Sequence, residues 1–184
     1  MPVNDSNAER PIFTIRLGGS SDLKVLAQVE IDANWSLITA GASVSTSPSA
    51  TPRHLMEQAI SEKLVFIAVD ELDQPLGFLA GLERDGGLYI GEIDVWREWQ
   101  GKGIGSALIR HALHIGRERG LWGAMLSTDR YAPFNMPFYE KLGFFEISVT
   151  EAPTALSAVI HDELDRGHNP ARRVAMIHRF SVEG

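Results

Sequence analysis

The chain carries a glycine-rich turn that reads Gln100-Gly101-Lys102-Gly103-Ile104-Gly105-Ser106, between an apolar strand pattern and a long amphipathic helix pattern. Three glycines at alternate positions let a backbone turn tightly and approach a ligand closely. The first N–H groups of a helix have no partner inside the helix, so with the helix dipole they attract an anion. The turn therefore predicts a phosphate-binding loop, and the alternative is a plain glycine-rich turn.

Two common phosphate motifs do not match this turn. A P-loop needs Gly-x-x-x-x-Gly-Lys-Ser/Thr, whereas here Gly103 follows Lys102. A dinucleotide fingerprint needs a third glycine, whereas Ser106 and Leu108 stand in its place. The turn is therefore of another kind.

Apolar periodicities and turn residues divide the rest of the chain into alternating short elements. Strands are predicted at residues 12–17, 64–69, 76–82, 88–95, 123–127, 144–150 and 173–182. Helices are predicted after Ser20 or Ser21 as the cap, from Thr51-Pro52 with Pro in the first turn, and at residues 104–119, 134–142 and 154–166. The pattern is that of one mixed α/β unit.

Length and composition limit what the chain can be. With 184 residues, 44% of them hydrophobic, it is long enough for one domain with a real core, 1–184. Its net charge of −7 argues against nucleic-acid or anionic-membrane binding, and its longest apolar run, 64–69, is too short to span a membrane. It has no cysteine, which suits a cytoplasmic location and excludes a cysteine-bound intermediate.

Two segments are predicted to be flexible. Residues 1–10 are polar, and residues 41–53 are mostly small or turn-forming. A loop of the second kind beside a binding site would act as a gate.

Two acids alternate with apolar residues at the end of the predicted strand 88–95. Glu92 and Asp94 therefore share one face of the strand, which suggests a cleft or a wet edge. Two close carboxylates raise the pKa of one of them, which suits a general base. The alternative is a solvated strand end or an ion pair with Arg97. The six histidines have no metal-ligand spacing, so no metal site is predicted.

Two motifs together resemble a known family. The pattern Gln-x-x-Gly-x-Gly at Gln100, Gly103 and Gly105 resembles the acetyl-coenzyme A signature of the GNAT N-acetyltransferase superfamily, in which Arg is commoner at the first position. Residues 138–144, Phe-Tyr-Glu-Lys-Leu-Gly-Phe, are similar to its Phe-Tyr-x-x-x-Gly-Phe helix. The resemblance extends over residues 12–182. Within the superfamily, the chain is similar to a largely uncharacterised bacterial branch that has an extra helix before the last strand.

The resemblance implies an α/β (α+β) fold with a mixed, mostly antiparallel sheet of about seven strands flanked by helices. It also implies acetyl-coenzyme A as co-substrate, held by main-chain amides around the turn and the strand end. The implied cofactor contacts are Val95, Gln100, Gly101, Lys102, Gly103, Ile104, Gly105, Ser106 and Asn135. Asn135 could instead cap the helix. Tyr139 is implied as the acid for the departing thiolate, with Glu92 or Asp94 as the base.

The sequence thus predicts an acetyl-coenzyme A-dependent N-acetyltransferase in which a primary amine attacks the thioester directly. A small-molecule acceptor is preferred. A peptide or protein acceptor and a non-catalytic acyl-coenzyme A-binding regulatory module stay open, and so does a homodimer.

Overall fold

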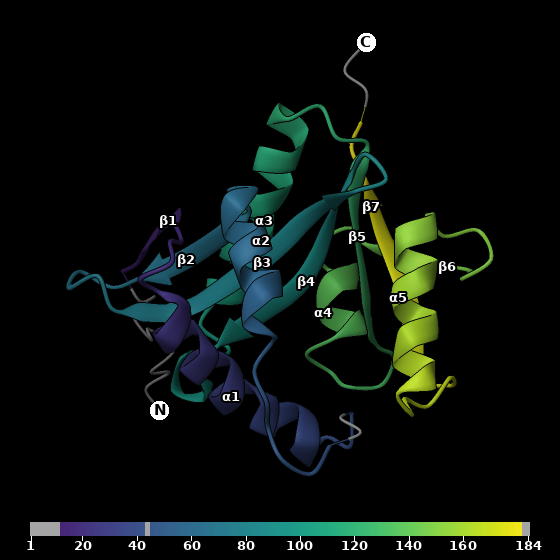
Figure 1. Ribbon diagram of the computed structural model, residues 1–184, viewed down its shortest axis with the longest axis horizontal. Helices are drawn as coiled ribbons and strands as arrows, with labels where there is room; N and C mark the ends of the chain where they lie inside the picture. The colour runs from purple at the N-terminus through teal and green to yellow at the C-terminus, as the bar shows by residue number, and fades with distance from the viewer. Residues whose placement is uncertain (1–11, 43–44, 182–184) are drawn as a thin grey trace, which may run out of the picture.

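In the computed structural model, which describes residues 12–42 and 45–181, one seven-stranded sheet runs through the molecule (Figure 1). Its order is β1-β2-β3-β4-β5-β7-β6, and only β4 and β5 are parallel neighbours. The strands are β1 (Thr14–Leu17), β2 (Val65–Val69), β3 (Pro75–Arg84), β4 (Gly87–Val95), β5 (Gly123–Asp129), β6 (Phe145–Ile147) and β7 (Arg173–Arg179). The predicted seven-stranded, mostly antiparallel sheet is confirmed.

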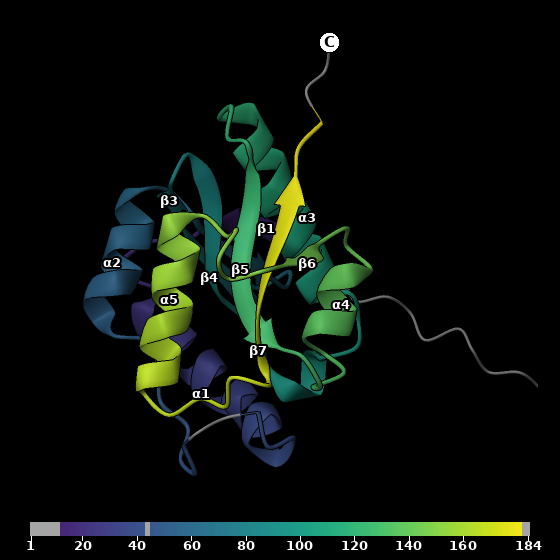
Figure 2. The ribbon, with the colours of Figure 1, turned by 90° about the vertical axis from the view of Figure 1, so that its right-hand side faces the viewer.

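Helices cover both faces of the sheet (Figure 2). One face carries α1 (Leu23–Thr39), α2 (Arg53–Ser61) and α5 (Thr154–Asp165), and the other carries α3 (Ile104–Glu118) and α4 (Met136–Glu140). A short 3-10 helix, η1 (Arg97–Trp99), follows β4. The helix α5 is the predicted extra helix before the last strand.

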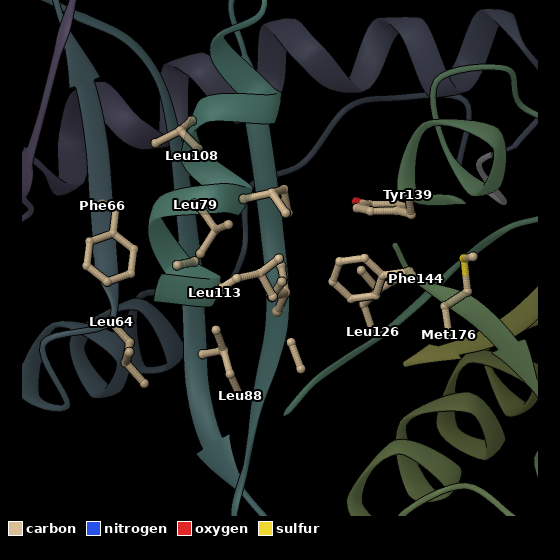
Figure 3. Close-up of a cluster of buried hydrophobic side chains, with 14 of the residues drawn as sticks. Leu64, Phe66, Leu79, Leu88, Leu108, Leu113, Leu126, Tyr139, Phe144 and Met176 are labelled. Carbon is tan, nitrogen blue, oxygen red and sulfur yellow. The ribbon is translucent and has the colours of Figure 1, made fainter. Parts of the chain in front are cut away.

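The strands are buried on both faces because their alternate side chains enter two different cores. On β2, Phe66 packs with α3, whereas Val65 and Ile67 pack with α1 and α2. Figure 3 shows the α3 side, where Phe66, Leu79 and Leu108 lie together. Each such side chain contributes roughly 1.5–3 kcal/mol by leaving water.

Three local predictions are wrong. The residue before α1 is Asp22, and neither Ser20 nor Ser21 caps the helix; the Asp22 carboxylate accepts the Gly19 N–H at 2.8 Å and pairs with Arg16. Pro52 precedes α2 and does not lie in its first turn. The strand predicted at residues 144–150 shortens to β6, because it is an edge strand that pairs only with β7.

The two parallel strands separate along their length. β4 and β5 are paired only at Leu88 with Ala124 and Tyr89 with Met125. Figure 1 shows the two strands close together at one end and apart at the other. The second half of β4 therefore has no neighbouring strand on the side of β5. Its main-chain groups on that side are left unpaired by a strand, and the sheet opens between β4 and β5.

A β-bulge in β4 turns its acidic side chains away from the α3 core. Ala80 is paired with Glu92 but Gly81 with Ile90, so Gly91 is an extra residue in β4. Before the bulge Ile90 packs on the α3 side, and after it Ile93 does, so the side-chain alternation is reversed. Without the bulge, Glu92 would share the face of Ile90.

Candidate active site

The opening between β4 and β5 is a cleft of about 1130 Å³. It is also lined by α1, the segment before α2, the start of α3, α4 and α5. Eleven predicted site residues line it: Glu92, Asp94, Val95, Gln100, Gly101, Gly103, Ile104, Gly105, Ser106, Asn135 and Tyr139. Lys102 does not line it. The Nζ of Lys102 lies over the ring of Trp99, 4.2 Å from the centroid.

The glycine-rich turn has the geometry of an anion site. Gly101 and Gly103 have φ of 74° and 88°, in the left-handed region that glycine adopts without strain. The first hydrogen bond of α3 runs from the Ala107 N–H to the Gly103 carbonyl, so three amides precede the helical ladder. Those amides belong to Ile104, Gly105 and Ser106, at the positive end of the helix dipole. They fit a pyrophosphate.

Gln100 fixes the turn to the end of β4. Its Nε2 donates to the Val95 carbonyl at 3.1 Å, and its Oε1 accepts from the Ser36 hydroxyl at 3.3 Å. The Trp96 N–H donates to Leu76 on β3, so the Val95 N–H points to the opposite side, into the opening. A main-chain donor therefore lies beside the anion site.

Glu92 and Asp94 meet a third acid, Glu30 of α1, which the sequence analysis missed. One carboxylate oxygen of each lies within 4.8 Å of the others. The Thr51 hydroxyl lies 2.8 Å from an oxygen of Glu30 and 2.8 Å from an oxygen of Glu92, and the Thr51 N–H donates to Glu30 at 2.7 Å. We refer to Glu30, Thr51, Glu92 and Asp94 as the acidic cluster.

Burial raises the pKa of every carboxyl group in the acidic cluster. The pKa of Glu92 rises to about 8, first through burial and then through the charge of Glu30. Burial and the neighbouring charges of Glu92 and Glu30 raise the pKa of Asp94 well above its ordinary value. Burial also raises the pKa of Glu30. The two acids predicted from the strand pattern are thus neither a solvated strand end nor paired with Arg97, whose partner is Asp32.

Tyr139 reaches the cleft from the opposite face of the sheet. It lies in α4, packs edge-on against Phe138 and Phe144, and extends its hydroxyl away from the helix toward the sheet (Figure 3). Burial and then the charge of Asp94 raise the pKa of Tyr139, so its hydroxyl keeps its proton at neutral pH. Asn135 stands at the N-cap of α4, but its side chain makes no capping hydrogen bond.

The wall of the cleft opposite β4 carries a partly buried ion pair, with side chains 11% and 13% exposed. Arg173 of β7 donates from Nε to Glu163 of α5 at 2.9 Å and from a terminal nitrogen to the Ser127 hydroxyl at 2.8 Å. The Ser127 hydroxyl donates to Glu163 at 2.6 Å. This wall therefore holds a neutral, fully paired network.

The chain was compared with known families and solved structures. The model of the "Acetyltransferase (GNAT) family" matches residues 33–144, more than half of the chain. N-acetylglutamate synthase from Neisseria gonorrhoeae, solved with coenzyme A and N-acetyl-glutamate, has a TM-score of 0.69 at 18% identity. The match covers 93% of this chain but only 36% of that one, so this chain spans about a third of that protein's length.

Two further solved structures match over nearly their whole length. PaiA N-acetyltransferase from Thermoplasma acidophilum, in complex with coenzyme A, has a TM-score of 0.64 at 17% identity, covering 92% of this chain and 99% of that one. The ribosomal-protein-S18-alanine N-acetyltransferase from Escherichia coli has a TM-score of 0.63 at 20% identity, covering 94% and 97%.

Within the described residues, no helix is both long and apolar enough to cross a membrane. The open sheet, the anion site at the start of α3 and the family match agree with one another. The chain belongs to the acetyltransferase (GNAT) family, and it is an acetyltransferase.

Proposed function

We propose that this protein transfers the acetyl group of acetyl-coenzyme A to the nitrogen of a small primary amine. The amine attacks the thioester directly, while both substrates are bound in a ternary complex. One observation carries the proposal: the acidic cluster faces the same cleft as the anion site of α3, and its carboxyl groups have raised pKa values. A carboxyl group with a pKa near neutrality is suited to take a proton from an ammonium group.

On the acetyl-coenzyme A side, main-chain donors do the binding. The free amides at the start of α3 would hold the pyrophosphate, and Asn135 lines the same cleft. The Val95 N–H, which points into the opening, would donate to the thioester oxygen and stabilise the negative charge that develops there. The hydrogen bond from Gln100 to the Val95 carbonyl holds this part of the strand in place.

On the amine side, Glu92 would act as the base, directly or through water. It takes one proton from the ammonium group, and the nitrogen lone pair then forms a bond with the thioester carbonyl carbon. The carbon–sulfur bond breaks and the thiolate takes a proton from the Tyr139 hydroxyl. The nitrogen loses its second proton, which restores the hydroxyl. The products are an acetamide, coenzyme A and one proton.

The segment before α2 supports a small acceptor over a peptide. The Asn34 side chain donates to the Ser49 carbonyl at 2.8 Å, and Thr51 is bound to Glu30 and Glu92. These contacts hold residues 49–51 against α1 and β4, beside the acidic cluster. A segment fixed there leaves less room for a peptide than for a small amine.

Thiol release from acetyl-coenzyme A, measured with a panel of acceptors, tests the proposal. Small primary amines should give release that is lost in Glu92→Gln, and peptides with free N-termini should give much less. Release with peptides alone would make the protein a peptide acetyltransferase. Tight binding of acetyl-coenzyme A without release by any acceptor would make it a binding module.

A further inference from the structure

The acidic cluster contains an unpartnered buried oxygen. Asp94 is 8% exposed, and its Oδ2 has no hydrogen-bond partner among the described residues. Leaving such an atom unpaired is costly unless a ligand group bonds to it. One carboxylate oxygen of Asp94 lies within 4.8 Å of one carboxylate oxygen each of Glu30 and Glu92, so the three acids converge on one point. A hydrogen-bond donor with positive charge is the group that this point suits.

The position of Thr51 suits an acidic cluster that holds a proton. Its hydroxyl lies 2.8 Å from one oxygen of Glu30 and 2.8 Å from one oxygen of Glu92. A hydroxyl has a single proton, which two charged carboxylates would have to share. With a proton on one of the two carboxyl groups, the hydroxyl donates one hydrogen bond and accepts the other, so both contacts are satisfied. The geometry therefore favours one proton on Glu30 and Glu92 together.

Among the residues that the structure describes, the surroundings of the acidic cluster supply no free cation that could replace this proton. The titratable groups that act on the acidic cluster from other positions are Tyr89, Tyr139, Glu163 and Arg173. The single cation among them, Arg173, is already paired with Glu163. The cluster is thus balanced by a proton or by a cation that enters the cleft.

The arginines of the cleft argue against an acceptor that carries a carboxylate beside its amine. Each arginine that lines the cleft in the described residues has a carboxylate partner: Arg84 with Glu62, Arg166 with Asp162 and Arg173 with Glu163. Lys141 also lines the cleft, but it follows α4 on the other face of the sheet.

We propose that the acidic cluster of Glu30, Thr51, Glu92 and Asp94 is a subsite for an organic ammonium group. The ammonium group binds in exchange for a proton. The acceptor is therefore an alkyl amine without a neighbouring carboxylate. This inference rests on the proposed function, because it names the substrate class of the same site. Glu30 is then a specificity-determining residue, supplied by a helix far from β4 in the sequence. One proton leaves for each ammonium group that binds, and the net charge of the subsite stays constant.

The test is a titration of the carboxyl carbons in the carbon-13-labelled full chain, followed by NMR. The pH runs from ~5.5 to ~9.5, which brackets the raised pKa. The resonance that titrates near pH 8 is assigned by its loss in Glu92→Gln. Butylammonium chloride at ~50 mM should lower its midpoint by ~1 unit or more, which corresponds to ~tenfold preference for the deprotonated cluster. The neutral isostere 1-butanol should leave the midpoint unchanged.

Matched variants separate the acidic cluster from general electrostatics. Glu30→Gln should lower the midpoint without any amine and reduce the butylammonium effect at least ~threefold. Glu57→Gln, at an exposed ion pair on α2, should behave as wild type. The wild-type titration decides the question even if Glu30→Gln fails to fold.

Three outcomes would overturn the inference: a midpoint that butylammonium does not move, an equal effect of 1-butanol, or a larger effect of magnesium chloride than of butylammonium. Thiol release from acetyl-coenzyme A with butylamine is measured on the same samples. A midpoint shift without thiol release from any amine would contradict the proposed function and leave the ammonium subsite standing. Thiol release without a midpoint shift would do the reverse.

Discussion

The two walls of the cleft hold acids in opposite states. On the α5 side, Glu163 is bonded to Arg173 and Ser127, so its charge is balanced inside the protein. On the β4 side, Glu30, Glu92 and Asp94 face one another with only the Thr51 hydroxyl between two of them. Both groups of acids lie at the same opening between β4 and β5.

The difference separates structural acids from chemical ones. Removing one partner of a hydrogen-bonded ion pair away from water is costly, because the other charge is left uncompensated. Buried acids without a cation raise each other's pKa, which costs stability but yields a base near neutral pH. We therefore expect substitutions on the α5 side to affect stability and substitutions on the β4 side to affect rate.

The largest effect is expected from Glu163→Gln. It leaves Arg173, whose side chain is 11% exposed, without its charge partner, so stability should fall by ~3 kcal/mol, or roughly 6–12 °C in melting temperature. Thermal unfolding at neutral pH measures the change. The control is Glu146→Gln, which breaks the more exposed pair with Arg130 and should cost less than ~1 kcal/mol. Equal losses in the two variants would erase the distinction between the walls.

Glu92→Gln should lower kcat by ~10²-fold or more, because it removes the base while keeping the side-chain shape. Activity in the wild type should rise with pH through about 8, as Glu92 loses its proton, and this limb should flatten in the variant. The melting temperature should not fall. Glu83→Gln, at an exposed position of β3, is the matched control. A pH profile unchanged from wild type would assign the base to Asp94 or to water.

Gly103→Ala should weaken coenzyme A binding ~tenfold, measured by titration calorimetry. A Cβ at Gly103 meets no atom within 4 Å, but its φ of 88° is strained for alanine, so the turn should relax and its amides should move. Gly120, after the other end of α3, has φ of 71° and equally open surroundings. Gly120→Ala should therefore lose similar stability and keep its affinity. Equal affinities in both variants would remove the anion site from the turn.

Tyr139→Phe should lower kcat up to ~tenfold, because it removes the proton donor for the thiolate and keeps the ring in its aromatic contacts. Coenzyme A affinity and melting temperature should change less. Tyr131→Phe, at an exposed position, is the control. Equal rates for Tyr139→Phe and wild type from pH ~6 to ~9, around the thiol pKa, would make Tyr139 structural.

The remaining expected effect is a change in the pH dependence of stability. Glu92 has a pKa raised from its ordinary 4.5 to about 8, so between these values the folded state binds more protons than the unfolded state. Stability should therefore fall as pH rises through this range, by up to ~1.4 kcal/mol per pH unit for one proton. Glu30→Gln should reduce the slope, and Glu57→Gln should not. If the stability of the wild type instead rose with pH over this range, the pKa of Glu92 would not be raised in the folded state.

Much of the fold follows from local patterns. The periodicities predicted the seven strands and the helices α3 and α5, and the turn at residues 100–106 marked the start of α3. The β-bulge in β4 was not predicted, although Gly91 inside an apolar strand pattern is a signal for one. The flexibility of residues 41–53 stays a prediction, and positions 43–44 and 1–10 lie outside the described residues. The single-domain organisation, the cytoplasmic location and the homodimer also stay predictions.

The acidic cluster was predicted only in part. Strand alternation placed Glu92 and Asp94 on one face, but Glu30 and Thr51 come from segments far away in the sequence. Glu30 had a faint signal, since it lies among the buried residues Leu26, Val29 and Ala33 of α1. A carboxylate in such an apolar stripe has to find a partner or a function.

By itself, the sequence determined the order of the elements, the glycine-rich turn and the family resemblance, because these depend on neighbours a few residues apart. Only the tertiary structure decided which face the acids of β4 occupy, how far β4 and β5 separate, and that Glu30 joins the cleft. These features depend on strand pairing and helix packing across tens of residues. The pKa values follow from the same packing, because burial and the distance between charges determine them.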